Sequence, residues 1–242
     1  LLPDEAHVIM EASGPYYFKI AMYLYQKGIK VSVVNPLVIR RFCQMRMVRT
    51  KTDRKDAAMI REYGLTEKPI LWNPDEPAIT KLKQLNSTIE LLEKQISATR
   101  NQLEAFTEMP DTDIIIIKTL KLLIKNNLKQ KEKMESEMET VATTFYKETH
   151  KALQTIPGIG AKSSAMLVAI TGNFKRFSNY KQLVAYVGLN PRVFESGTSV
   201  KGRGRISKMG TARMRKMLYL CSWSARRYNI YCKEMYDRLK AK

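Results

Sequence analysis

Three carboxylates near the start of the chain have the types and spacing that metal-dependent phosphoryl transfer uses. Glu11 follows the apolar residues 8–10, and Asp53 and Asp56 stand three residues apart. Ligands collect at the carboxyl ends of strands in open α/β sheets, and residues three apart share a helix face. Carboxylates that converge in this way bind Mg²⁺, which also takes oxygen ligands from phosphates. The alternative is that Glu11 ends a strand in solvent and that Asp53 only caps its helix.

A second candidate for chemistry is a serine in the glycine-rich, basic segment 188–213. Ser196 precedes Gly197, and Ser199 lies three residues further on. A serine hydroxyl can attack a phosphate if a base or metal-bound oxygens activate it. Composition alone favours a simpler interpretation, a loop that holds phosphates without chemistry.

The segment Ile156–Gly160, with sequence IPGIG, precedes an apolar helical stretch. This pattern predicts the hairpin of a helix-hairpin-helix motif. Gly158 and Gly160 would let the backbone approach a phosphate at the following helix start, near Lys162. The alternative is an ordinary tight turn before a helix.

The net charge is +19, and residues 201–242 carry 13 Lys and Arg against two acids, which is a surplus of 11. Such concentrated charge indicates a polyanionic partner. The expected nucleic-acid contacts are the backbone of Gly158 and Gly160 and the side chains of Arg49, Lys51, Arg54, Lys55, Lys162, Arg192, Lys201, Arg203, Arg205, Lys208, Arg213 and Arg215.

Composition also excludes several classes of protein. No apolar run approaches the roughly 20 residues of a membrane-spanning helix. The three cysteines and two histidines are scattered, so no structural zinc site is expected. Unpaired cysteines fit a reducing cytoplasm.

The elements that would position these residues fall into three predicted domains. In residues 1–70, strands at 7–11 and 30–34 flank a helix over 15–27, which predicts a parallel pair. A helix from Thr52 or Asp53 to about Tyr63 follows, with Gly64 after it. Residues 75–148 show apolar residues at alternating spacings of three and four, broken at Pro110, which predicts a helical coiled-coil hairpin.

In that hairpin the expected seam includes Leu82, Leu85, Ile89 and Ile96 on one helix and runs to Phe145 on the other. Residues 149–242 form the third predicted domain, mainly helical and ending in one helix over 212–240. The expected fold class is therefore mixed α/β and α.

Several segments, in order, resemble one known family, the DEDD-type insertion-sequence transposases that include the Piv DNA invertase. The segments are HVIMEASGPY, RTKTDRKDA, LQTIPGIGAKSSAMLVAITGNFKRF, YVGLNPRVFESGTSVKGRGRISKMG and ARMRKMLY. The resemblance covers nearly the whole chain and implies a RuvC-like (RNase H-like) first domain with four acids. Glu11, Asp53 and Asp56 match the last three, and the first acid is expected before Leu1, on a strand that this chain lacks.

The resemblance implies that Ser196 forms a phosphoserine link to DNA while the acids hold Mg²⁺ at the same phosphate; Ser199 is the reserve candidate. It further implies donor and target DNA, a structured guide RNA encoded by the element, and a dimer or tetramer. We expect a prokaryotic, cytoplasmic and nucleoid-associated protein, with no membrane partner. Without the first acid, this chain is expected to bind metal poorly.

Two other functions remain open. A metal-dependent nuclease or Holliday-junction resolvase would use Glu11, Asp53 and Asp56 with water as the nucleophile. A non-enzymatic remnant would only bind DNA through the helix-hairpin-helix motif and the last helix.

Overall fold

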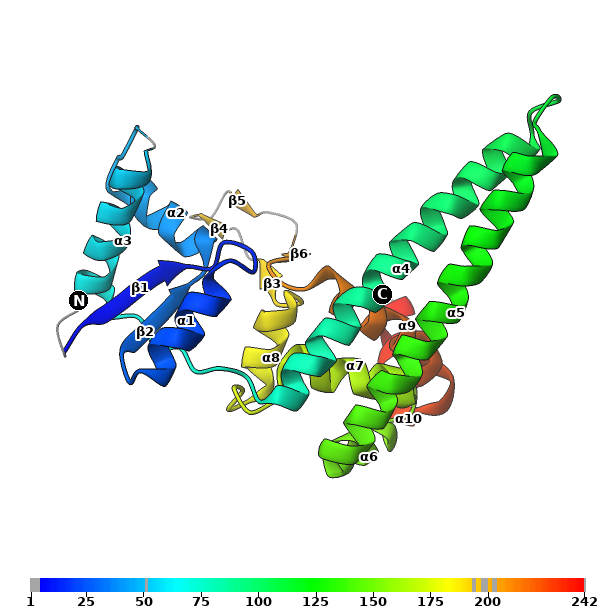
Figure 1. Ribbon diagram of the computed structural model, residues 1–242. Helices are drawn as coiled ribbons and strands as arrows, with labels where there is room; N and C mark the ends of the chain where they lie inside the picture. The colour runs from blue at the N-terminus through cyan, green and yellow to red at the C-terminus, as the bar shows by residue number, and fades with distance from the viewer. Residues whose placement is uncertain (1–4, 51, 193–194, 197–199, 202–203, 242) are drawn as a thin grey trace. The chain divides into compact units, whose positions relative to one another are not determined.

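The computed structural model describes residues 5–50, 52–192, 195–196, 200–201 and 204–241, without the side chains of 195, 196, 200 and 201. The chain divides into two compact units, residues 1–74 and 75–242 (Figure 1). Most described residues are helical, and the strands are short, so the expected mixture of α/β and helical structure is confirmed.

The first unit is built on a parallel pair of strands. β1 (His7–Glu11) and β2 (Lys30–Val34) pair in register from His7 opposite Lys30 to Glu11 opposite Val34. The crossover is helix α1 (Tyr17–Gln26), whose Ala21 and Leu24 pack with Val31 in a small core. The predicted β-α-β unit is confirmed, whereas its RuvC-like identity stays a prediction.

Two further helices complete this unit, α2 (Pro36–Met45) and α3 (Asp53–Glu67). The expected end of α3 before Gly64 is wrong, because the helix continues to Glu67. Gly64 lies where α3 crosses β1, and a Cβ there would stand 1.8 Å from Ile9 Cδ1. The glycine therefore serves close helix–strand packing rather than helix termination.

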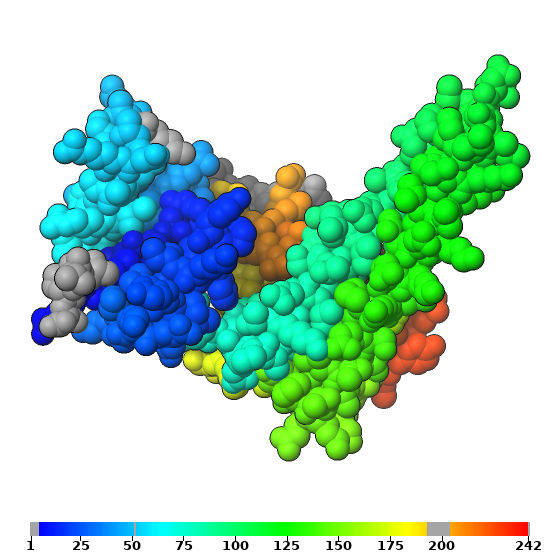
Figure 2. All heavy atoms as spheres, in the orientation of Figure 1, coloured from blue at the N-terminus to red at the C-terminus, as the bar shows by residue number. Residues whose placement is uncertain are grey.

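The second unit begins with a long helical hairpin, α4 (Pro77–Thr107) and α5 (Ile114–Phe145). Leu82, Leu85, Ile89 and Ile96 are buried, as their spacing predicts. The outer part of the hairpin projects beyond the helices that pack on its base (Figures 1 and 2).

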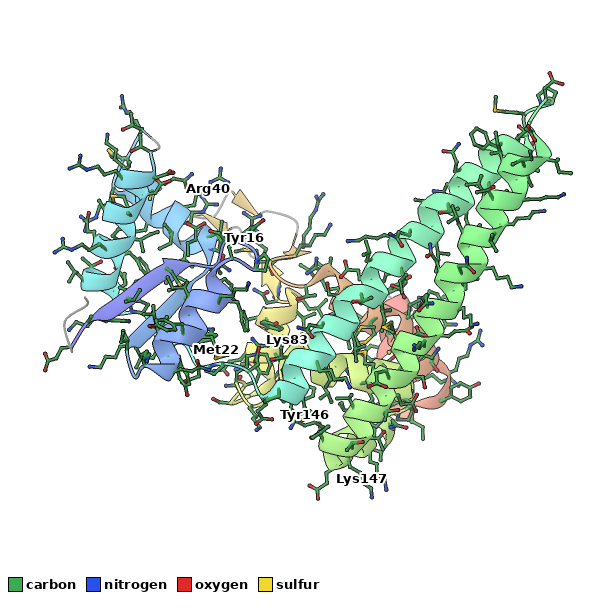
Figure 3. The ribbon with its side chains drawn as sticks, in the orientation of Figure 1. Tyr16, Met22, Arg40, Lys83, Tyr146 and Lys147 are labelled. Carbon is green, nitrogen blue, oxygen red and sulfur yellow. The ribbon has the colours of Figure 1, made fainter. Side chains whose placement is uncertain are left out.

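The predicted seam runs to Phe145, but this is wrong, because Phe145 is 64% exposed. The helix ends there, and the next residue, Tyr146, leaves helical geometry and turns into the core. Tyr146 is labelled in Figure 3. Its hydroxyl donates to Glu76 Oε2 over 2.8 Å, which ties the end of α5 to the start of α4.

Helix α7 (Ala161–Thr171) is the centre of this unit. One face packs against the base of the hairpin through Ala165, Val168 and Ala169. Its other face, with Leu167 and Ile170, shares a core with the later helices. The hairpin and the C-terminal helices therefore have continuous packing, and the division into domains 75–148 and 149–242 stays a prediction.

The remaining elements surround α7. They are α6 (Lys147–Gln154), α8 (Tyr180–Val187), α9 (Ala212–Tyr228), α10 (Ile230–Lys240), and the two-residue strands β3 (Pro191–Arg192), β4 (Glu195–Ser196), β5 (Val200–Lys201) and β6 (Arg205–Ile206).

The single helix expected over 212–240 is wrong, because Asn229 divides it. Asn229 has extended backbone angles, and its side-chain oxygen accepts a hydrogen bond from the Cys232 N–H over 3.2 Å. The asparagine is thus an N-cap that starts a new helix in a new direction. None of the helices in the described residues has the length and apolar character needed to cross a membrane.

Candidate functional site

The carboxylates of Glu11 and Asp56 both influence the Cys43 thiol in the first unit. Glu11 is half-buried at the carboxyl end of β1, and Asp56 is half-buried one turn into α3. Burial, followed by the negative charges of Asp56 and then Glu11, raises the pKa of the Cys43 thiol on α2. Both carboxylates therefore lie within electrostatic reach of one side chain, although they are 45 positions apart in sequence.

Asp53 has a different position from its two partners. It is exposed in the first turn of α3, where a negative charge favours the helix. The alternative that Asp53 caps the helix is wrong: the Thr52 hydroxyl accepts the Lys55 N–H over 3.3 Å and is the cap. The Asp53 carboxylate is thus not used as the cap of its own helix.

A cleft of about 570 Å³ opens between β1 and α3. Its polar lining includes Glu11, Ser13 and Arg61, and its apolar lining includes Ile9 and Ile60. One acid of the predicted set therefore borders an open space beside an arginine, an arrangement that can receive a phosphate near a carboxylate.

The three acids do not make a complete protein cage for a metal ion. Within the described part of the chain, no three His, Cys, Asp or Glu side chains are arranged to share a cation. Mg²⁺ commonly takes only one or two protein carboxylates and fills its other positions with water and phosphate oxygens. A Mg²⁺ ion beside these acids would therefore need ligands from solvent or from a bound substrate.

Several basic residues lie in and just before the first turn of α3, the helix that carries Asp53 and Asp56. Arg49, Arg54 and Lys55 are exposed, and Lys55 Nζ donates to the Thr50 hydroxyl. Lys51 lies outside the described residues. Exposed guanidinium and ammonium groups next to the start of α3 suit a phosphate backbone.

The two glycines of the IPGIG segment differ in their surroundings. Gly158 has φ +101°, and a Cβ there would lie 2.5 Å from the Cys221 carbonyl oxygen on α9. Gly160 precedes α7 with φ −87°, and no atom of the described residues stands within 4 Å of the corresponding position. Gly158 is therefore required for internal packing, and of the two glycines Gly160 is the one with an open backbone position.

In the glycine-rich segment 190–207, here called the arm, the described residues form two short antiparallel strand pairs. At its base, Pro191 and Arg192 pair antiparallel with Ile206 and Arg205, and the Ser207 hydroxyl donates to Asn190 Oδ1 over 2.6 Å. Further out, Ser196 pairs with Val200.

The arm's predicted contacts are described only in part. Arg192, Arg205 and Lys208 are exposed. The side chains of Ser196 and Lys201, and all of Gly197, Ser199 and Arg203, lie outside the described residues.

Arg215 bonds the backbone on both sides of the arm, just before and just after residues 190–207. Its guanidinium donates to the Val187 carbonyl oxygen over 2.8 Å and to that of Gly210 over 3.0 Å. A Cβ on Gly210 would lie 2.2 Å from the Tyr186 carbonyl oxygen, so the backbones meet closely at this point. Arg215, predicted to contact nucleic acid, instead joins the two segments that flank the arm in this structure.

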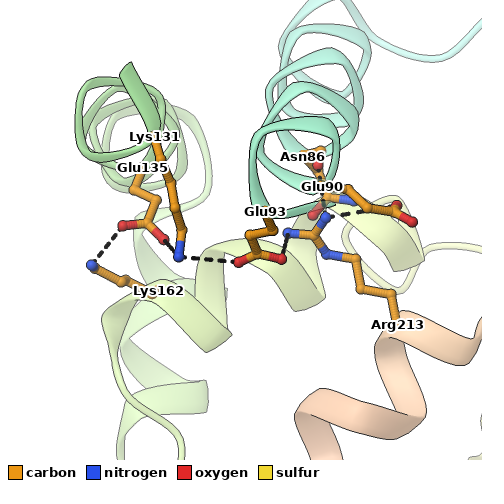
Figure 4. Close-up of polar contacts among 7 residues, drawn as sticks. All are labelled: Asn86, Glu90, Glu93, Lys131, Glu135, Lys162 and Arg213. Atoms are coloured by element: carbon orange, nitrogen blue, oxygen red, sulfur yellow. Dashed lines mark hydrogen bonds and ion pairs between the residues drawn. The ribbon is translucent and has the colours of Figure 1, made fainter. Parts of the chain in front are cut away.

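Arg213 and Lys162 are ends of one ion-pair network (Figure 4). Arg213 lies 3.6 Å from Glu90 and 3.8 Å from Glu93, and donates to the Asn86 carbonyl oxygen over 3.1 Å.

Lys131 continues the network, 3.2 Å from Glu93 and 3.5 Å from Glu135, and Lys162 bonds Glu135 over 2.7 Å. That hydrogen bond is the main reason why the pKa of Lys162 is raised. Lys94 also pairs with Glu90 over 3.0 Å, so three carboxylates offset most of the charge of Arg213, Lys131, Lys162 and Lys94, and Arg213 and Lys162 add little to a nucleic-acid-binding field.

Sequence reasoning missed two parts of these sites. Cys43 and Arg61 had no motif to mark them, and only the packing of α2 and α3 brings them to the acids. The division at Asn229, which exposes a surface between α9 and α10, did have a signal, since asparagine is a favoured N-cap.

Basic side chains concentrated in one part of a chain are typical of proteins that bind nucleic acids. Two family models match the chain: one described as Transposase, for the DEDD transposases of IS110 type, over residues 2–108, and one described as Transposase IS116/IS110/IS902 family over residues 150–237. The chain belongs to this transposase family.

Curated relatives extend over the same region. The chain is 31% identical over 220 residues to the pilin gene-inverting protein of Moraxella bovis, which covers 88% of this chain and 65% of that protein. The pilin gene-inverting protein of Moraxella lacunata has the same identity and coverage. The transposase for insertion sequence element IS1328 of Yersinia enterocolitica is 27% identical over 245 residues, 89% of this chain and 69% of that protein. The chain thus spans slightly less than two thirds of the pilin gene-inverting proteins.

Proposed function

We propose that this protein cuts and rejoins DNA strands as a transposase or DNA invertase. Family membership across both units carries the proposal, since the two models together match most of the chain. The relatives named above are a transposase and proteins that invert a gene. The charge of +19 supports a polyanionic substrate.

Ser196 is our proposed nucleophile. Its hydroxyl would attack a DNA phosphorus, forming a serine–phosphate ester as the bond to the leaving deoxyribose oxygen breaks and that oxygen takes a proton. The reverse reaction on a second strand would rejoin the DNA. A basic arm with a fastened base supports this role, because phosphate contacts on both sides of Ser196 would fix the scissile bond.

Glu11, Asp53 and Asp56 are proposed to bind Mg²⁺ together with DNA phosphate oxygens. The small number of protein carboxylates that Mg²⁺ needs is compatible with three acids that form no complete cage. The open cleft that Glu11 borders beside Arg61 supports this assignment, as do the negative charges of Asp56 and Glu11, which both raise the pKa of the Cys43 thiol. A readout independent of strand transfer is calorimetric Mg²⁺ titration of the protein and of Asp56→Asn.

The proposed partners are donor and target DNA, a structured guide RNA, and further copies of the chain, in the cytoplasm near the nucleoid. The projecting hairpin, with its exposed Ile114, Ile115 and Leu122, supports self-association.

The test is a covalent-adduct assay with end-labelled DNA, Mg²⁺ and candidate guide RNA, resolved on a denaturing gel. A slow, protease-sensitive DNA band is expected with the protein and with Ser199→Ala, and its loss is expected with Ser196→Ala. Cleavage with free ends and no adduct in any variant would instead indicate a metal-dependent nuclease. DNA binding without cleavage in any variant would support the third alternative, a non-enzymatic protein that only binds DNA.

A further inference from the structure

Between α9 and α10 lies an apolar cleft of about 300 Å³ that the proposed chemistry does not use. The cleft is lined mainly by aromatic and aliphatic side chains, among them Tyr219, Trp223, Met235, Tyr236 and Leu239. Trp223 is 49% exposed and Tyr219 is 61% exposed. Large aromatic rings in a cleft open to solvent are uncommon in an unbound surface and indicate a binding site.

Arg226 is the polar group of this cleft. Its guanidinium lies 5.1 Å from the Trp223 ring centroid and 4.4 Å from that of Tyr236. It has no carboxylate partner among the ion pairs of the described residues, in contrast to Arg213 on the same helix. Its positive charge therefore lies against the two rings at the edge of the aromatic surface, with no carboxylate of these ion pairs to offset it.

A second hollow, about 370 Å³, adjoins the first and shares Arg226 and Tyr236 with it. Its other lining residues are Arg227, Lys233 and Lys240 with one acid, Asp237. An apolar aromatic cleft beside a cationic hollow has the two chemistries of a nucleotide: a base to stack and a phosphate to neutralise.

We infer that the α9–α10 cleft binds an unpaired base of single-stranded DNA, with the adjoining phosphate in the cationic hollow. Charge decides against a second copy of the chain, because residues 219–240 carry five Lys and Arg against two acids and would repel themselves. The choice of DNA rests on the proposed function, in which strand exchange leaves bases unpaired near the enzyme. The site would hold the displaced strand while the ends are exchanged.

Tryptophan fluorescence tests this inference. The chain has two tryptophans, so Trp72→Phe leaves Trp223 as the sole reporter. Titration with an unlabelled single-stranded DNA oligomer is expected to quench Trp223, and an abasic oligomer of equal length and charge is not. The equivalent duplex should bind with little quenching, because its bases are already stacked.

Variants locate the site. Trp223→Ala and Tyr236→Ala are each expected to weaken single-strand affinity about tenfold, whereas Trp223→Phe retains most of it. Tyr231→Ala is the matched control, because Tyr231 is an 82% exposed tyrosine on α10 that does not line the cleft. Circular dichroism and thermal midpoints verify that each variant is folded.

The inference is overturned if abasic DNA or duplex quenches as strongly as the single strand, or if Tyr231→Ala weakens binding as much as Tyr236→Ala. Stronger quenching by RNA of the same sequence would reassign the site to RNA. A change in Trp223 emission with protein concentration alone would reassign it to self-association. Adduct formation is measured in a separate assay. A negative fluorescence result therefore does not contradict the proposed strand transfer, and absence of the adduct does not contradict single-strand binding at the α9–α10 cleft.

Discussion

Arg213 and Arg226 occupy the same helix, α9, but the structure uses them in opposite ways. Arg213 has 11% side-chain exposure and contacts two glutamates and a backbone carbonyl. Arg226 lies against two aromatic rings at an open cleft. The comparison teaches that a basic helix is not uniformly a binding surface: the first turn of α9 stabilises the fold, and its last turn borders an open cleft.

The glycines show the same contrast and provide the largest expected effect. Gly158→Ala places a methyl group against the Cys221 carbonyl oxygen in a backbone conformation with positive φ. We expect a loss of about 3 kcal/mol in the free energy of unfolding. Gly160→Ala should change it little, because the position is open. Urea denaturation of both variants measures this difference, and equal stabilities would contradict the packing role of Gly158.

Removal of the two arginines should separate stability from binding. Arg213→Leu removes a mostly buried guanidinium that contacts Glu90, Glu93 and the Asn86 carbonyl oxygen, and leaves these glutamates only Lys94 and Lys131; it should cost about 2 kcal/mol. Arg226→Leu should leave the denaturation midpoint within error but weaken DNA binding. If Arg213→Leu is as stable as the parent, the network in Figure 4 is not a stabilising feature.

The salt dependence of DNA affinity sharpens the comparison further. Arg205 and Lys208 are exposed, so Arg205→Gln and Lys208→Gln should each reduce the slope of log affinity against log salt by about one. Lys162→Gln should reduce it less, because Glu135 already neutralises that ammonium. A full unit of change with Lys162→Gln would show that the ion pair opens to bind DNA.

The smallest expected effect is a pH dependence from His150. Burial lowers its pKa, and its Nδ1 lies 2.8 Å from the Ser164 hydroxyl. As the pH falls, His150 is therefore protonated in the unfolded chain at a higher pH than in the folded protein. The His150 contribution to stability is complete above about pH 6.5 and is lost as the pH falls toward the lowered folded pKa. Thermal midpoints between pH 8 and 5 should fall less steeply for His150→Gln.

The spacing of apolar residues and the positions of Gly, Pro and capping residues predicted the elements that depend on local sequence. The two strands, the crossover helix and the hairpin follow from apolar spacing, and Leu82 and Ile89 are buried as expected. The errors fall where tertiary contact overrides a local rule. Gly64 lies within α3 because close packing against β1 leaves no room for a side chain at that position. Tyr146, and not Phe145, is the residue that is buried at the end of α5.

The candidate sites divide in the same way. Residue types and order predicted Glu11, Asp53, Asp56 and the serine-bearing segment as candidates, and their roles stay predictions. No local pattern could show that Arg213, Arg215 and Lys162 bond within the chain, since their partners lie on other elements. The cleft beside Trp223 likewise arises only from the packing of α10 on α9.

The central claim is serine-linked strand transfer, and mapping of the covalent adduct tests it most directly. Trypsin cleavage after Arg192 and Lys201 releases a peptide, residues 193–201, that contains both Ser196 and Ser199. After nuclease trimming of the adduct, fragment-ion masses should locate a phosphodeoxynucleotide on Ser196. The same mass on Ser199, on another residue, or on no peptide in a reaction that exchanges strands, would contradict the account.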